Sequence, residues 1–209
     1  MPIPLLGYIH FASYFIPAAV ALYRFRSLQK PFRILAVLTV IACFNVTSLF
    51  VLGQLGINNS FQINFYVLLE FVLVGWIFQQ AAGSATLRRF FTTLLLLFPI
   101  IWIFDKVFIE IPDEMNTEMA LLSRLFLVVM AVFVIAPEQR DLYARMVDKA
   151  IFWTAAAVIL YSSGTFLVFG LGNVLLKEDV SQFVLIWHIN WALLIVANLL
   201  YTKAILSRS

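Results

Sequence analysis

The sequence contains few of the residues on which most enzyme and metal sites depend. Cys43 is its only cysteine, and His10 and His188 are its only histidines. A single cysteine excludes an internal disulfide and every multi-cysteine metal motif. Two histidines are too few for a zinc site of the usual kind. We therefore expect no metal and no cofactor, and we assign no catalytic residue.

Charge is also scarce, because charged residues make up 12% of the 209 residues, against 63% hydrophobic residues. This composition, with a mean hydropathy of +0.98, cannot form a water-soluble surface, so we expect an integral membrane protein in contact with membrane lipid. The net charge of +3 comes from basic residues in short loops rather than from a basic groove or arm. Nucleic acid is therefore excluded as a partner.

Seven segments are long and apolar enough to cross a membrane, which takes roughly 20 mainly apolar residues as a helix. Continuous apolar runs such as 93–104 favour helices over the alternating strands of a membrane barrel. No linker or soluble domain separates the segments, so the sequence predicts an all-α bundle of seven transmembrane helices forming one domain, 1–209. The predicted spans are residues 8–23, 33–53, 61–79, 90–109, 118–136, 150–171 and 182–202.

Basic residues in short loops mark the cytoplasmic side of a membrane protein. The loops alternate in charge along the chain: one set holds most of the basic residues, and the other set holds mainly acidic residues. Only two basic residues, Lys106 and Lys177, belong to the acidic set. This asymmetry predicts an outside N-terminus and a cytoplasmic C-terminus. The basic side carries eleven residues: Arg24, Arg26, Lys30, Arg33, Arg88, Arg89, Arg140, Arg145, Lys149, Lys203 and Arg208.

Two opposite charges, Glu70 and Arg124, lie inside apolar spans. An ionisable residue within a span marks a candidate functional site. At a helical rise of about 1.5 Å per residue, Glu70 lies roughly 13 Å and Arg124 roughly 9 Å from the outer ends of their spans. We expect both side chains to point into the bundle. The pair is then either a salt bridge that fixes helix register or a ligand or proton site, unless the two do not pair.

Other polar residues fall at comparable depths. Tyr66 is one helical turn outward of Glu70 on the same face, and Asn45, Ser163 and His188 lie six to nine residues from the outer ends of their spans. We predict that Glu70, Arg124, Tyr66, His188, Asn45 and Ser163 form a ligand-binding zone. The alternatives are interhelical hydrogen bonding for Asn45 and Ser163 and packing for His188.

Two enzyme-like patterns receive little support. A retinal protein needs a lysine in the interior of the last span for its Schiff base, but Lys203 lies at the cytoplasmic end of that span. Retinal is therefore excluded. Ser163–Gly164 with His188 resembles the dyad of rhomboid proteases, but Tyr161 stands where that motif has its first glycine. Ala156, Ser163 and Gly170 recur at spacings of seven, which predicts close helix packing instead.

One resemblance covers most of the chain. It rests on the runs at 64–71, 152–153, 161–166, 187–188 and 198–201, which are similar to small, poorly characterised bacterial seven-helix proteins and to the seven-helix membrane modules that precede histidine kinases. The resemblance implies sensing or signal transduction and a location in the bacterial cytoplasmic (inner) membrane. We expect the output to come from a separate signalling partner or a homo-oligomer. We therefore expect a receptor-like sensor of a small or lipidic ligand. A proton-coupled transporter that uses Glu70 is the alternative, and an intramembrane hydrolase is the third reading.

Overall fold

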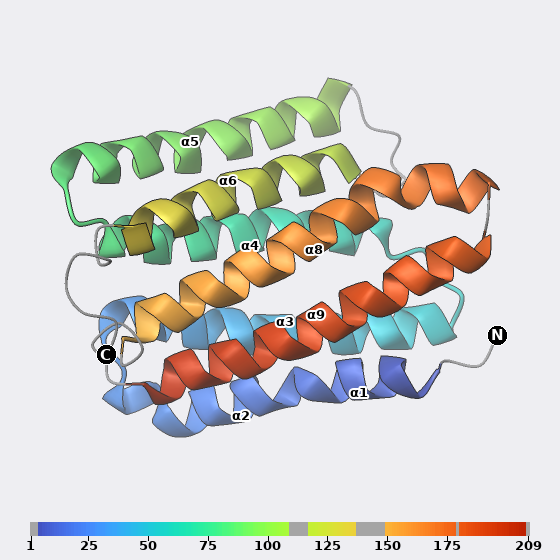
Figure 1. Cartoon of the computed structure of the whole chain (residues 1–209), viewed down its shortest axis with the longest axis horizontal. Coiled ribbons are helices and arrows are strands. Elements are labelled where there is room, and N and C mark those ends of the chain that lie inside the picture. Colours follow the sequence, from blue (N-terminus) through green and yellow to red (C-terminus); the bar gives the residue numbers. More distant parts are fainter. Residues whose placement is uncertain (1–3, 109–116, 137–148, 179, 208–209) are drawn as a thin grey trace.

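The computed structural model describes residues 4–108, 117–136, 149–178 and 180–207, with the backbone alone at 167, 171–178 and 180–183. Most of these residues are helical, and no strand occurs among them. The elements are α1 (Leu5–Ser13), α2 (Phe15–Arg24), η1 (Phe25–Ser27), α3 (Lys30–Gln54), α4 (Ser60–Ala81), α5 (Ala85–Phe108), α6 (Thr117–Ile135), α8 (Ala150–Glu178) and α9 (Val180–Leu206) (Figure 1).

The described helices include seven that are long and apolar enough to cross a membrane, as the sequence predicts. The first is α1, α2 and η1 taken together. Helix α8 extends to Glu178, beyond the predicted end at 171, and α9 begins at Val180, before the predicted start at 182. Asp105 and Lys106, grouped with the loop charges although the fourth predicted span reaches 109, belong to the last turn of α5. Residues outside the described ranges include 109 of the fourth predicted span and Glu110, Asp113, Glu114, Arg140, Arg145, Asp179 and Arg208.

The first span is interrupted at Tyr14, where α1 ends and α2 begins. Pro17 explains the interruption, because proline has no N–H to donate to the carbonyl of Ser13, four residues earlier. A hydrogen bond connects this interruption to the last span: Asn198 Nδ2 on α9 donates to the hydroxyl of Ser13 at 2.8 Å. Pro99, by contrast, lies inside an uninterrupted α5.

Six spans surround a common interior, and the seventh lies outside it. Contacts between neighbours run from α1–α2 through α3, α4, α6, α8 and α9, and α9 returns to α1 and α2. Helix α5 packs mainly on α4, at the edge of the bundle in Figure 1. Phe71 and Phe98 join α5 to α4 with ring centroids 4.3 Å apart. The outer faces expose large apolar side chains such as Leu96 and Ile100, which suits contact with lipid.

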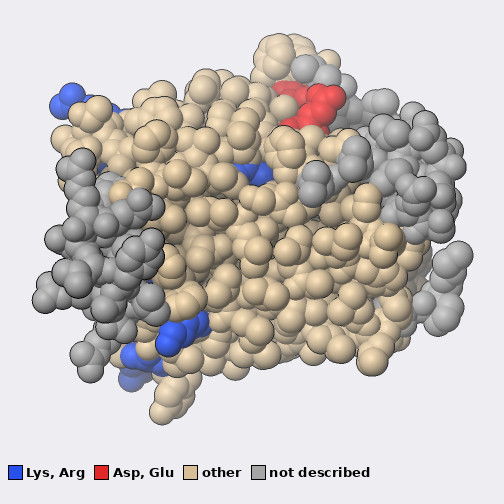
Figure 2. Space-filling view, viewed as in Figure 1, with Lys and Arg blue, Asp and Glu red and all other residues tan. Residues whose placement is uncertain are grey.

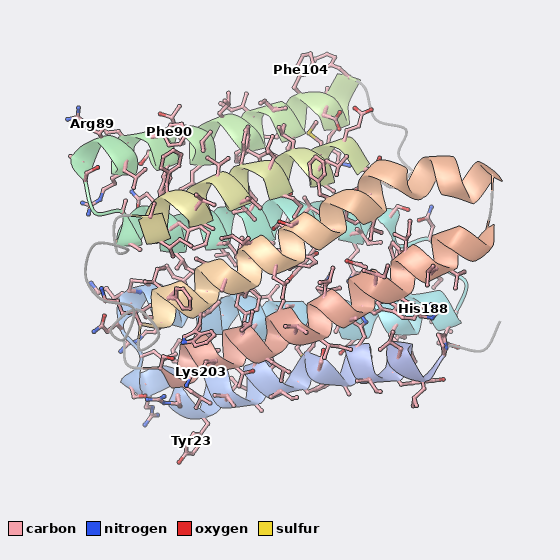
Figure 3. The ribbon with its side chains drawn as sticks, in the orientation of Figure 1. Tyr23, Arg89, Phe90, Phe104, His188 and Lys203 are labelled. Atoms are coloured by element: carbon pink, nitrogen blue, oxygen red, sulfur yellow. The ribbon has the colours of Figure 1, made fainter. Side chains whose placement is uncertain are left out.

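Most of the described basic residues gather at one end of the bundle, and acidic ones lie near the other (Figure 2). Arg89 and Lys203 both lie at the basic end (Figure 3). Some of these residues have structural roles. Arg24 Nη1 donates to the carbonyls of Ile205 and Leu206 at 3.1 and 2.8 Å, which satisfies the last carbonyls of α9 with a favourable charge.

Close packing of α8 depends on a different row of small residues from the predicted one. Ser163 and Gly170 are exposed, so the predicted packing row that contains them is wrong. Ala150 and Ala157 are buried, and Gly164, seven residues further on, lies so close to α9 that any Cβ atom would collide with the side chain of Leu193. The packing row is displaced by one residue, or about 100° around the helix.

We predict that Gly164→Val destabilises the bundle by roughly 1 to 3 kcal/mol, because added atoms must displace Leu193 and the backbone around it. Gly170→Val is the matched control on the same helix, since nothing lies within 4 Å of the position that a Cβ atom would take there. Thermal unfolding in detergent micelles measures both. Equal stability of the two variants would contradict the close approach of α8 and α9.

Candidate polar site between α4, α6 and α8

Glu70 of α4 and Arg124 of α6 form a buried ion pair. Arg124 Nη2 lies 2.7 Å from Glu70 Oε2, and the two side chains are 2% (Arg124) and 7% (Glu70) exposed. Each belongs to a buried helix face, which Val67 and Val74 continue on α4 and Ala131 continues on α6. The similar depths of Glu70 and Arg124 inferred from the sequence therefore correspond to direct contact.

Tyr161 of α8 is the third member of the network. Arg124 Nη2 also donates a hydrogen bond of 3.0 Å to the Tyr161 hydroxyl, and the guanidinium carbon lies 4.5 Å from the centroid of the Tyr161 ring. A cation over an aromatic face is attracted by the ring quadrupole. One guanidinium thus links α4, α6 and α8.

Arg124 has more donors than these partners use. Its Nε and Nη1 atoms are buried and have no hydrogen-bond partner in the structure, and the same holds for the hydroxyl of the neighbouring Ser162. Arg124 and Ser162 are 2% and 1% exposed. A buried donor without a partner costs about 1 to 3 kcal/mol, so such groups in a native site call for a partner.

A small central cavity lies inside the ring of six spans. Its volume of about 30 Å³ exceeds the roughly 10 to 15 Å³ that a cavity needs to hold one water molecule. Four tyrosine side chains and the carboxylate of Glu70 dominate its wall. The lining residues are Tyr14, Pro17, Leu38, Thr39, Ala42, Tyr66, Glu70, Tyr161, Leu194, Ala197, Asn198 and Tyr201.

A second and larger pocket, the α6–α8 groove, lies on the outer surface of the bundle. It has a volume of about 430 Å³ and is lined by Arg124, Leu125 and Val128 of α6 and by Ser162, Ser163 and Phe166 of α8. Figure 2 shows a small basic spot within the apolar face over α6. Arg124 therefore pairs with a wall residue of the central cavity and also lines the outer groove.

The structure divides the six predicted site residues among four places. Glu70 and Tyr66 line the central cavity, whereas Arg124 and Ser163 line the α6–α8 groove. Asn45 instead accepts a hydrogen bond of 2.9 Å from Gln62, which ties α3 to α4. His188 lies towards the end of α9 opposite Lys203 (Figure 3).

His188 belongs to an aromatic cluster at the junction of the first and last spans. Its half-buried ring packs edge-on against Trp191, with centroids 5.2 Å apart. The ring of His10 stacks on the same indole at 5.9 Å. His188 lines neither the central cavity nor the groove, and the structure places it with packing residues rather than beside Ser163.

Tyr161 and Ser162 were not predicted as site residues. The sequence does indicate that Arg124 needs further partners, because an arginine has five N–H donors and a single carboxylate cannot satisfy all of them in lipid. A search for hydroxyl groups at the depth of Arg124 would have found both. Tyr14 and Tyr201 reach the cavity from the first and last spans, and only the arrangement of the helices reveals them.

No group of three or more histidine, cysteine, aspartate and glutamate side chains that could hold a metal ion occurs among the described residues. The chain matches no protein-family model, no curated protein and no solved structure. The interpretation of the site therefore depends on its geometry.

We predict that Glu70→Gln lowers the free energy of unfolding by roughly 3 to 5 kcal/mol, because it leaves a buried guanidinium without its counter-ion. Arg124→Met should cost less, since a carboxylate left alone can take up a proton whereas a guanidinium cannot lose one. The double variant should recover much of the loss. Thermal and denaturant unfolding of all four proteins completes a double-mutant cycle, and strictly additive losses would show that the ion pair contributes no coupling.

Proposed function

We propose that the protein is a seven-helix membrane sensor that binds a small or lipidic ligand without covalent chemistry and signals to a separate partner. The observation that supports this function is the incomplete hydrogen bonding of Arg124. A salt bridge that served structure alone would be stabilised most when all its donors were satisfied. The buried Nε and Nη1 atoms without partners fit a site that awaits an acceptor from a ligand.

This network connects ligand binding to the contacts between helices. Arg124 contacts Glu70 on α4 and Tyr161 on α8, so a ligand that draws the guanidinium away changes contacts to two neighbouring helices at once. A ligand shifts an equilibrium only by its differential affinity for the two states. Weakening of the Glu70 contact on binding would supply that difference.

The proposed orientation places the N-terminus outside and the C-terminus in the cytoplasm of a bacterial inner membrane. The excess of basic residues in the loops at one end supports it. The signalling partner, or a second copy of the chain, would then bind at the basic cytoplasmic end. The similarity to the membrane modules of histidine kinases favours such an output.

The orientation is tested by cysteine labelling in a Cys43→Ser background. We expect Asn58→Cys, between α3 and α4, to react with an impermeant thiol reagent added to whole cells, and Gly83→Cys, between α4 and α5, to react only after the membrane is opened. Both positions are exposed. Labelling of Gly83→Cys in intact cells, without labelling of Asn58→Cys, would reverse the orientation.

Ligand binding is tested by mass spectrometry of the small molecules that remain bound after gentle purification. We expect wild type to retain a molecule that the Glu70→Gln/Arg124→Met double variant loses, because recognition in an apolar pocket depends on a few placed polar groups. His188→Gln is the control with an intact site, and it should retain the same molecule. Equal retention by the double variant would place the ligand elsewhere.

Transport is the competing function, because Glu70 lines the central cavity and a buried carboxylate can carry a proton. Purified protein in liposomes distinguishes the two functions. A sensor binds the retained molecule without moving protons. Proton flux that depends on this molecule and disappears in Glu70→Gln would favour the transporter.

A further inference from the structure

The α6–α8 groove combines apolar walls with a polar floor. Leu125, Val128 and Phe166 form the walls, and Arg124 and Ser162 lie at the floor. Arg124 is seven residues from the start of α6 at Thr117, or roughly 10 Å along the helix. The floor therefore lies well inside the hydrocarbon layer, below the depth of lipid head groups.

The groove faces lipid rather than the interior of the bundle. Leu125 and Phe166 are 48% and 44% exposed, and Ser163 is exposed beside them. An occupant can enter sideways from the bilayer. The volume of about 430 Å³ falls within the range of about 300 to 1,000 Å³ that is typical of ligand pockets.

The unpartnered polar groups of the groove are donors. Arg124 Nε and Nη1 can only donate, and the Ser162 hydroxyl can donate as well; none of these atoms has a partner in the structure. Their complement is a hydrogen-bond acceptor. Glu70 already balances the charge of Arg124 at 2.7 Å, so a second anion would bring an uncompensated charge into a medium of low dielectric constant. An uncharged acceptor avoids that cost.

We infer that the α6–α8 groove binds an amphiphile from the bilayer that has a hydrocarbon chain and an uncharged, carbonyl-bearing head group. The carbonyl oxygen accepts hydrogen bonds from Arg124 and Ser162, and the chain lies along Leu125, Val128 and Phe166. This inference rests on the proposed sensing function and names the class of its ligand. Acyl amides, acyl esters and quinones belong to this class.

Access to the floor requires a small adjustment at the rim. Arg124 lines the groove, but its Nε and Nη1 atoms are buried, so an acceptor reaches them when a rim side chain such as Leu125 or Phe166 rotates. Both side chains face lipid and have room to do so. Rotamer changes of this kind are common on binding.

The test uses wild-type protein in lipid nanodiscs and myristamide that carries a photoreactive diazirine in its chain. We expect saturable labelling of the α6 and α8 segments that line the groove. Ser163→Phe fills the groove from its exposed side without touching the ion pair, and it should reduce this labelling by about tenfold, the effect of ~1.4 kcal/mol. Ala192→Phe, an exposed position on α9 outside the groove, is the matched control and should label like wild type.

Competition with unlabelled compounds tests the chemistry of the head group. Myristamide should displace the probe about tenfold better than tetradecanesulfonate or tetradecylammonium, which have the same chain but carry charge. N-methylacetamide, a carbonyl compound without a chain, should not compete. Better competition by the sulfonate would overturn the uncharged head group, and competition by N-methylacetamide would overturn the bilayer as the source of the ligand.

Two further outcomes would overturn the site itself. One is labelling that spreads evenly over all lipid-facing helices, and the other is groove labelling that Ser163→Phe leaves unchanged. Either outcome is separate from the proposed function, which depends on retention of an endogenous molecule through Glu70 and Arg124. That retention can hold while the groove inference fails.

Discussion

A carboxylate and a guanidinium that are buried in hydrocarbon must pair with each other, and this requirement constrains how the helices of the bundle pack. Glu70 and Arg124 meet at 2.7 Å with both side chains buried, so α4 and α6 must turn these faces towards one another. Helix α5 lies between them in sequence and yet packs mainly on α4, outside the ring of six spans. The ion pair is thus consistent with direct contact between α4 and α6, with the intervening helix at the edge.

The same interaction connects structure with the proposed function, because a guanidinium has more donors than one carboxylate can satisfy. Tyr161 takes one further hydrogen bond, and two nitrogen atoms stay without a partner. Arg124 lies between the central cavity and the groove. It contacts Glu70 and Tyr161, which line the central cavity, and it lines the groove itself. A ligand that accepts from these two nitrogen atoms on the lipid side would bind the same guanidinium that holds Glu70 and Tyr161 through Nη2.

Polar residues at similar depth in the membrane have different surroundings in this bundle. Ser163 lines the groove with Arg124, whereas Asn45 joins α3 to α4 through Gln62 and His188 packs on Trp191. Depth along a helix can be counted from the sequence, but the direction in which a side chain points depends on the rotation of the helix about its axis. Packing against neighbours sets that rotation, which explains why depth alone grouped residues that the structure separates.

The sequence by itself determined the membrane class, the seven spans and the two opposite charges at matching depth, because hydrophobic length and helical rise are properties of each segment alone. Only the tertiary structure decided which helices are neighbours and which faces they share. In the folded bundle, Tyr161 bonds to Arg124 and Ser162 lines the same groove as Arg124. The packing row of α8 contains Gly164 instead of the predicted Ser163. A shift of one residue turns a helix face by about 100°, and in a chain that is apolar on nearly every face the hydrophobic pattern does not specify that angle.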